Sequence, residues 1–314
     1  MAQKKKQKEF SSIWTIAVLA IGILWYIVAP NEAIKEVKTL YTSPTEVVET
    51  NNSDEFLVSG DLDIYFFYVG QADSIFISCN GANMLIDAGN NADGRLIVNQ
   101  LTKIGINKID YLIGTHPHED HIGGLDNVIK SFNIGKIYMP KREAESKTFE
   151  DVLDSVSEKK LKISTPKKGQ TFYLGEAECK IVSAQSDAED TNDASIVIEV
   201  SYGKHKYLFT GDLTSTGESN IEWNDIDVLK VAHHGSRYSS SKDFLNVTKP
   251  EISIISCGKE NDYGHPHKEA LNRLQKINTE IYRTDKDGTI HLTSDGNKIA
   301  IESLDINLDG NGGD

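Results

Sequence analysis

The sequence predicts an α/β fold in which two β-sheets pack together and helices cover their outer faces. Two observations lead to this prediction. From residue 61 onward, short runs rich in Ile, Phe and Tyr are separated by Gly, Asn and Asp, which is the pattern of strands joined by tight turns. Amphipathic stretches with helical spacing lie between these runs, and 39% hydrophobic content in 314 residues is enough for a substantial core.

The elements follow one another in two series. Strands are expected at 63–70, 73–79 and 83–89, a helix at 95–103, a strand ending near 115, a helix at 125–132, a strand at 136–140 and an amphipathic helix at 149–161. A second series of strands follows at 171–175, 179–184, 195–203 and 206–212. Between 227 and 294 strands and helices alternate. Two sheets with the helices outside them are the natural arrangement of these elements.

The first 30 residues predict a membrane anchor. Four lysines between Lys4 and Lys8 precede an uncharged apolar run at 13–29, IWTIAVLAIGILWYIVA. This run is at the lower length limit for crossing a bilayer and is longer than the apolar part of a typical signal peptide. The lysines predict that the N-terminus stays in the cytoplasm, so that the chain is a single-pass protein of the cell membrane with its body extracytoplasmic. A cleaved signal peptide and a buried soluble helix are the alternatives.

Three further segments follow this predicted anchor. Residues 31–60 are polar and irregular, which predicts a linker without chemistry of its own. Residues 61–303 form the predicted folded domain, and residues 304–314 a flexible acidic tail. Asp305, Asn307 and Asp309 have the spacing that opens a calcium loop, but the bidentate acid that such a loop requires does not follow.

Charge and cysteine content narrow the possible functions. The net charge of −14 means that the overall field of the chain does not attract polyanions, so a nucleic-acid surface has to be local or a metal has to supply the positive charge. The three cysteines, Cys79, Cys179 and Cys257, lie far apart, which excludes a thiolate zinc ribbon and a dense disulfide scaffold. They are expected to be small core residues.

A metal site is predicted where an apolar strand ends in THPHEDHIGG. His116, His118, Asp120 and His121 stand within six residues there. Imidazole nitrogen and carboxylate oxygen suit zinc, manganese or iron, and the absence of thiolate argues against a closed structural zinc site. His116 and His118 project to one face of extended backbone and can bind one ion, while the following turn directs Asp120 and His121 to a second. A solvated histidine-rich loop is the alternative.

This motif, H-x-H-x-D-H followed by Gly-Gly, resembles the signature of the metallo-β-lactamase fold superfamily. The ordered series VGQADS, LIDAG, THPHEDHIGG, NDASIVIEV, TGD, LKVAHHGS and YGHPH resembles, more narrowly, the metallo-hydrolase domain of ComEC-like competence proteins and their free-standing relatives. The resemblance covers about residues 61 to 303. It implies an αββα sandwich, with two mixed β-sheets and helices on the outer faces, and makes residues 61–303 a hydrolase domain.

The resemblance also implies a set of site residues. The metal ligands would be His116, His118, Asp120, His121, Asp212 and His265. Asp212 would bridge two divalent metal ions, with zinc expected first and manganese as the alternative. Asp87 would orient the histidines without binding metal, and Asn192 and Ser195 would line the site where many members have a further metal histidine. Asp120, His234 and His233 are the expected catalytic residues, and His234, or else His233, would protonate the leaving oxygen.

The function expected from this site is hydrolysis. A hydroxide that bridges two metals would attack an anionic phosphodiester, either DNA or a cell-wall phosphodiester. Hydrolysis of a carboxylic ester, lactone or lactam at the same site is the alternative within enzymes, and a surface binding module with a relic site is the alternative outside them. The expected partners are the phosphodiester substrate and the membrane, and no dedicated protein partner is expected.

The predicted topology can be tested on cells. Protease added to intact cells or protoplasts should remove the domain that begins at residue 61, because the basic cluster before the apolar run keeps the N-terminus inside. A cytosolic marker protein should remain intact in the same sample. Full protection of the domain, with its recovery in the soluble cytosol, would contradict the predicted orientation.

Overall fold

The computed structural model describes residues 61–304. The predicted anchor at 1–30, the linker at 31–60 and the tail from residue 305 onward lie outside these residues. Within 61–304, no helix has both the length and the apolar character needed to cross a membrane.

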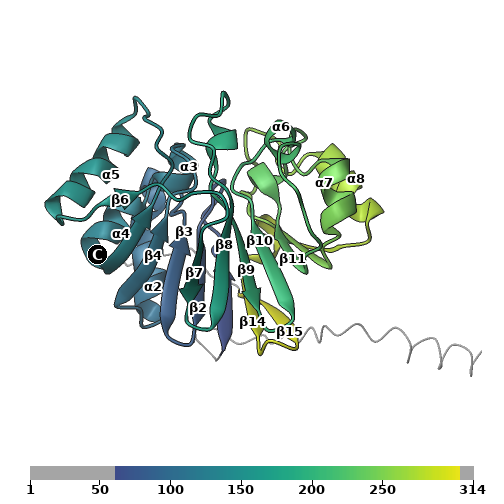
Figure 1. Cartoon of the computed structure of the whole chain (residues 1–314), viewed down its shortest axis with the longest axis horizontal. Coiled ribbons are helices and arrows are strands. Elements are labelled where there is room, and N and C mark those ends of the chain that lie inside the picture. Colours follow the sequence, from purple (N-terminus) through teal and green to yellow (C-terminus); the bar gives the residue numbers. More distant parts are fainter. Residues whose placement is uncertain (1–60, 305–314) are drawn as a thin grey trace, which may run out of the picture. The chain divides into compact units, whose positions relative to one another are not determined.

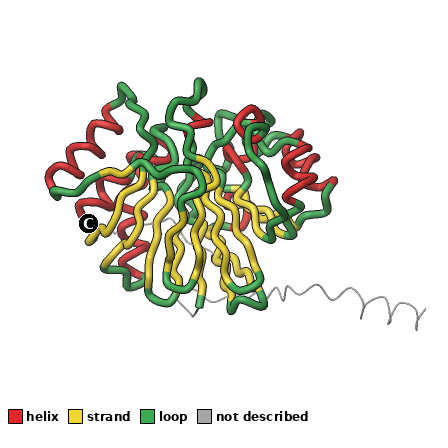
Figure 2. Tube along the Cα trace, viewed as in Figure 1, coloured by secondary structure: helices red, strands yellow, loops and turns green. Residues whose placement is uncertain are grey.

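Two mixed β-sheets form the centre of the described domain (Figures 1 and 2). The first has eight strands in the order β15-β14-β1-β2-β3-β4-β5-β6 and the second seven in the order β13-β12-β11-β10-β9-β8-β7. The first sheet consists of β1 (Leu62–Phe66), β2 (Ile75–Cys79), β3 (Ala82–Ile86), β4 (Lys108–Ile113), β5 (Asn133–Tyr138), β6 (Ile163–Ser164), β14 (Thr289–Ser294) and β15 (Ile299–Leu304). The second consists of β7 (Thr171–Leu174), β8 (Ala177–Ser183), β9 (Val197–Tyr202), β10 (His205–Phe209), β11 (Val228–Lys230), β12 (Ile252–Ile255) and β13 (Glu280–Arg283).

Each sheet has an antiparallel part and a parallel part. In the first sheet β14 and β15 and the meander β1 to β3 pair antiparallel, whereas β3, β4, β5 and β6 run parallel. In the second sheet β7 to β10 pair antiparallel, and β10, β11, β12 and β13 run parallel. The parallel parts need crossover connections, which helices and long loops supply.

Helices cover the outer faces of both sheets. The α-helices are α2 (Gly94–Lys103), α3 (Glu119–Ile122), α4 (Leu125–Ser131), α5 (Lys147–Glu158), α6 (Ser215–Glu218), α7 (Lys242–Thr248), α8 (Lys268–Lys276) and α9 (Thr284–Asp287), and the 3₁₀ turns are η1 (Asn91–Asp93), η2 (Asn192–Ala194) and η3 (Ala232–Gly235). Figure 1 shows α2, α4 and α5 on one side of the paired sheets and α7 and α8 on the other. The predicted α/β fold with two mixed sheets is therefore confirmed for residues 61–304.

Three apolar layers hold these elements together. The largest lies between the sheets, where Phe66 of β1 meets Phe209 of β10 with ring centroids 6.2 Å apart. A second joins the first sheet to α2, α4 and α5, and a third joins the second sheet to α7 and α8. Strand β1 is buried along its whole length because both of its faces are covered. Cys79, Cys179 and Cys257 are buried and unpaired, as expected of small core residues.

Element ends differ from the sequence-based expectation where local capping decides them. The helix expected at 149–161 begins two residues earlier, at Lys147, because the Ser146 hydroxyl accepts the N–H of Phe149 and caps the helix. It ends at Glu158, before the expected end. The edge strands β6 and β15 were not predicted, since β6 has only two residues and β15 mixes apolar and polar positions on a half-covered edge.

The Gly-Gly pair after the histidine motif is required by close backbone packing. A Cβ at Gly123 would lie 2.2 Å from the carbonyl carbon of Asn90 and from the nitrogen of Asn91, and a Cβ at Gly124 would lie 2.3 Å from the carbonyl oxygen of Ala88. The turn that carries the motif therefore packs directly on the loop after β3. This close packing sets the distance between the polar residues of the histidine motif and those of the loop after β3.

Gly123→Ala should destabilise the fold strongly, because its Cβ would meet backbone that no side-chain rotation can relieve. We expect a loss of about 3 kcal/mol or more in the free energy of unfolding, measured by denaturant titration. Gly70→Ala is the control: its Cβ would meet nothing within 4 Å, and only its φ of +71° opposes it. That control should cost about 1–2 kcal/mol. Equal losses in the two variants would contradict the close packing.

Candidate metal centre

Polar side chains gather at one edge of the two sheets, where parallel strands end. Asp87 follows β3, His116 and His118 follow β4, Asp120 and His121 lie on α3, Asp212 follows β10, and His233 and His234 lie on η3 after β11. The carboxyl ends of neighbouring parallel strands meet at the same edge of a sheet, which is where ligands bind in open α/β sheets. Residues distant in the sequence thus come together at this edge.

Asp87 fixes the orientation of the histidine motif. It is buried, with a left-handed φ of +60°. One carboxylate oxygen accepts the N–H of Thr115 at 2.8 Å and the other accepts the Thr115 hydroxyl at 2.7 Å. The second oxygen also lies 2.7 Å from Nδ1 of His121. Because Nδ1 of His121 faces this carboxylate, its Nε2 faces the opposite direction, toward Asp212. A residue that orients a metal histidine makes this kind of contact.

His234 is held in a comparable way from the other sheet. It is buried, and its Nδ1 lies 3.0 Å from the backbone carbonyl oxygen of Ser256. Its Nε2 lies 3.2 Å from Oδ2 of Asp120 and 3.7 Å from Oδ2 of Asp212. The backbone carbonyl therefore accepts a hydrogen bond from Nδ1–H, and Nε2 faces the site.

His116 and His118 face each other through their ring nitrogens. Nε2 of His116 and Nδ1 of His118 are 3.0 Å apart. Ser195 supports this pair, since its hydroxyl oxygen lies 3.4 Å from Nδ1 of His116 and accepts the N–H of Asp212 at 3.1 Å. Ser195 thus connects the loop after β4 to the loop after β10.

Four of these residues converge on one point. Asp120, His121, Asp212 and His234 each offer a ligand atom, and these atoms lie within 4.8 Å of one another. Nε2 of His121 and Oδ1 of Asp212 are 3.3 Å apart and buried, and neither atom makes a well-directed hydrogen bond. Buried polar atoms without partners are costly, and a cation between these two would satisfy both. The residues present therefore fit divalent metal ions of the kind that imidazole and carboxylate bind.

The pKa shifts of the clustered residues also indicate a site for cations. Burial alone would lower the pKa of His234, but the carboxylates of Asp212 and Asp73 raise this pKa to about 10. Burial would likewise raise the pKa of Asp212, but His121 and His234 hold it well below its usual range. Histidines that remain protonated when buried mark a strongly negative potential. Such a potential attracts cations.

A pocket of about 350 Å³ opens over this cluster, and His118, Asp120, Asp212, His233, His234 and His265 are among the residues that line it. His233 lies 3.6 Å from Asp212 through its Nε2, and burial lowers its pKa. His265 lies farther out on the rim, with its ring centroid 6.2 Å from that of His234. Tyr263 stands beside it, 68% exposed, with its ring stacked on that of His265.

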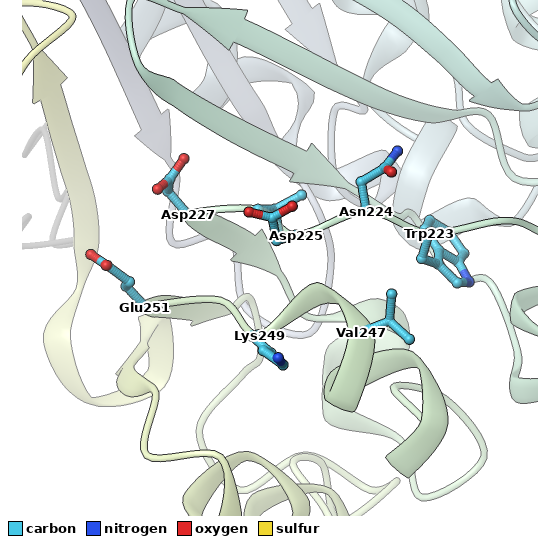
Figure 3. Close-up of a pocket in the computed structure, with 8 residues that line it drawn as sticks. Trp223, Asn224, Asp225, Asp227, Val247, Lys249 and Glu251 are labelled. Carbon is cyan, nitrogen blue, oxygen red and sulfur yellow. The ribbon is translucent and has the colours of Figure 1, made fainter.

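A larger depression of about 540 Å³ lies away from these histidines (Figure 3). Figure 3 shows the carboxylates of Asp225, Asp227 and Glu251 around it, with Lys249 and Val247 on the neighbouring segment. None of its lining residues is a histidine or a cysteine, and Asp227 already accepts the N–H of Lys206 at 2.7 Å. The volume of a pocket therefore does not identify the metal site. The ligand atoms that line the smaller pocket identify it instead.

The structure brings together nearly all the residues expected from the sequence, but it groups the histidines differently. The convergent set contains His234, and His265 is not among its members. Asn192 lines the pocket, and the hydroxyl oxygen of Ser195 lies 3.4 Å from Nδ1 of His116. Two residues were not foreseen, Asp73 in VGQADS and Lys230 in LKVAHHGS. Lys230 could have been noticed in the sequence, because it is a charged residue inside the otherwise apolar run VLKVA.

Known proteins resemble this chain over the same residues. The family described as the metallo-beta-lactamase superfamily matches residues 67–259. ComE operon protein 3 of Bacillus subtilis is 30% identical over 256 residues, which cover 74% of this chain and 33% of that protein. Competence protein ComA of Neisseria gonorrhoeae is 31% identical over 228 residues, which cover 70% of this chain and 30% of that protein. The matches thus span about a third of the length of these relatives.

Among solved structures, CmlA, a diiron beta-hydroxylase from Streptomyces venezuelae, aligns with a TM-score of 0.48 and 14% identity, over 72% of this chain and 53% of that one.

The family match includes the H-x-H-x-D-H motif, Asp212 and the two histidines of η3, the residues that meet at the strand ends. Sequence and geometry agree, and the chain belongs to the metallo-beta-lactamase superfamily.

Proposed function

We propose that the chain is a membrane-anchored, extracytoplasmic phosphodiesterase with a binuclear metal site. The observation that carries this proposal is the convergence of Asp120, His121, Asp212 and His234 at the floor of a pocket that opens to solvent. The anchor part of the proposal rests on the basic and apolar sequence of residues 1–30.

We propose that the ligands divide into two sets that share Asp212. His116 and His118, whose facing nitrogens are 3.0 Å apart, belong to one ion. Asp120, His121 and His234 belong to the other. This assignment replaces His265 by His234, because the Nδ1 of His234 is held by a backbone carbonyl as in metal-bound histidines.

His265 has a different role in this proposal. The side-chain amide N–H of Gln71 donates to Nδ1 of His265 at 3.2 Å, and the amide oxygen of Gln71 accepts the N–H of Gly258 at 3.1 Å, which fixes the direction of the amide. His265 then carries its proton on Nε2. Burial and the charge of His234 lower its pKa to about 4, so the ring is neutral near pH 7. A neutral N–H on the pocket rim suits a hydrogen bond to a substrate oxygen.

His233 is the proposed proton donor to the leaving group: burial lowers its pKa, but the carboxylate of Asp212 beside it opposes this shift and favours the protonated ring. It lines the pocket, its side chain is 26% exposed, and its Nε2 lies 3.6 Å from Asp212. Contact with solvent allows its proton to be replaced after each turnover, which the buried His234 does not allow. Divalent ions bound at such a site lower the pKa of a water molecule and offset charge on a phosphoryl oxygen.

A phosphodiester is the favoured substrate because two bound divalent ions would supply the local positive charge that its anionic group needs, although the net charge of the chain is −14. The name of one relative, competence protein ComA of Neisseria gonorrhoeae, refers to competence, which favours DNA among phosphodiesters.

The substrate proposal is tested by supplying the purified chain with Zn²⁺ or Mn²⁺ and offering bis-p-nitrophenyl phosphate, single-stranded DNA and a lactone. We expect hydrolysis of both phosphodiesters and loss of about 10²-fold or more in rate for Asp212→Asn. Lys242→Gln, an exposed change at the start of α7, should leave the rate unchanged. Turnover of the lactone alone would contradict phosphodiester specificity.

The histidine assignment is tested by metal analysis of single variants. His234→Ala should lose about one equivalent of metal, because it removes a ligand, and His265→Ala should keep the full content with a raised KM for phosphodiesters. His233→Ala should keep its metal and lose roughly 10²- to 10⁴-fold in kcat on substrates with poor leaving groups, with a smaller loss on nitrophenyl esters. Loss of metal in His265→Ala with full content in His234→Ala would reverse the assignment.

A further inference from the structure

A buried ion pair lies beneath the metal centre. Lys230, the last residue of β11, donates from Nζ to the carboxylate of Asp73, in the loop between β1 and β2. Both residues are 1% exposed. Burial of a lysine costs much desolvation free energy, and apolar residues of similar volume often serve stability equally well. The pair therefore calls for an explanation other than stability alone.

Asp73 contacts the rear of both histidines of the convergent set. Its Oδ1 lies 3.4 Å from Nδ1 of His234, and its Oδ2 lies 3.8 Å from Nδ1 of His121. The backbone of Asp73 also forms two hydrogen bonds. Its N–H donates to the carbonyl of Asp120 at 3.0 Å, and its carbonyl accepts the N–H of Gly89 at 2.8 Å. Asp73 thus touches the loop after β3, the helix α3 and the loop after β11.

Asp73 is not a further metal ligand in this arrangement. Asp73, Asp87 and His121 also offer ligand atoms within 4.8 Å of one another. The ammonium group of Lys230, however, already lies against Asp73, and Asp87 is bound by Thr115 and His121. The ammonium group of Lys230 therefore already supplies a positive charge at this second cluster.

We propose that Lys230 and Asp73 are positioning residues for the metal centre. Lys230 holds the carboxylate of Asp73 against the Nδ1 side of His121 and His234, so that the Nε2 atoms of both rings face Asp120 and Asp212. Without Lys230 the carboxylate is free to turn toward the metals as a misplaced ligand. This inference rests on the metal-site assignment proposed above.

The test separates positioning from stability with a charge-neutral double variant of the full-length chain. Lys230→Met leaves Asp73 buried and unpaired, so its melting temperature should fall. Adding Asp73→Asn removes the unpaired charge at nearly constant volume and should restore much of the melting temperature. Affinity for Zn²⁺, measured by competition with a chromophoric chelator, should remain about 10- to 100-fold weaker than in the wild type.

The matched control removes an exposed pair instead. Lys130→Met with Asp126→Asn deletes a surface ion pair of 2.6 Å on α4 and should change neither zinc affinity nor melting temperature appreciably. The single variant Asp73→Asn changes the shape of the side chain least. Its zinc affinity, measured in the same way, should also be weaker than that of the wild type. Wild-type zinc affinity in either folded variant would overturn the positioning role. A wild type that binds no divalent ion would instead overturn the metal site itself, and this inference with it.

Discussion

The structure depends on keeping several carboxylates together at one edge of two sheets. Asp73, Asp87 and Asp212 are buried within a short distance of His121, and Asp120 stands at the pocket floor. Like charges at such distances repel strongly where the dielectric constant is low. The fold can hold them only by providing positive charge in the same place. Lys230 supplies one positive charge, and the histidines, or the divalent ions proposed for this site, would supply the rest.

The topology explains how these groups meet. Each sheet turns from antiparallel to parallel pairing near its middle, at β3 and β4 in one and at β10 and β11 in the other. Parallel strands point their carboxyl ends to one edge, so each sheet supplies ligands from consecutive strand ends. The antiparallel hairpins contribute loops to the site, including the β1–β2 loop with Asp73 and the β8–β9 loop with Ser195. Their inner faces form the apolar layer that keeps the two edges aligned.

Much of this could be predicted from the sequence, since the decisive signals were local. The H-x-H-x-D-H motif places His116, His118, Asp120 and His121 on one turn whatever the rest of the chain does. The roles proposed for His234 and His265 could not be predicted in this way. They depend on which ring nitrogen meets Ser256, and which meets Gln71, contacts that form only when distant segments pack.

The backbone at η3 shows the same limit. His233 and His234 both adopt a left-handed φ of 52°, an uncommon conformation for residues other than glycine, which costs free energy unless the surroundings impose it. The N–H of His233 donates to the carbonyl of Gly211 beside Asp212, and Val231 is bound to β12. Tertiary contacts therefore determine the conformation of this turn, and the local sequence AHHG does not predict it.

The orienting contacts also show that the site requires both sheets to be packed together. Nδ1 of His121 is held from the first sheet by Asp87, and Nδ1 of His234 is held from the second by Ser256, while Asp73 reaches both from the β1–β2 loop. The ligand geometry therefore does not exist until both sheets have packed. A metal that binds only this geometry stabilises the packed state over every partly folded one. The same contacts that prepare the site for hydrolysis thus make metal binding a measure of whether the two halves of the sandwich have come together.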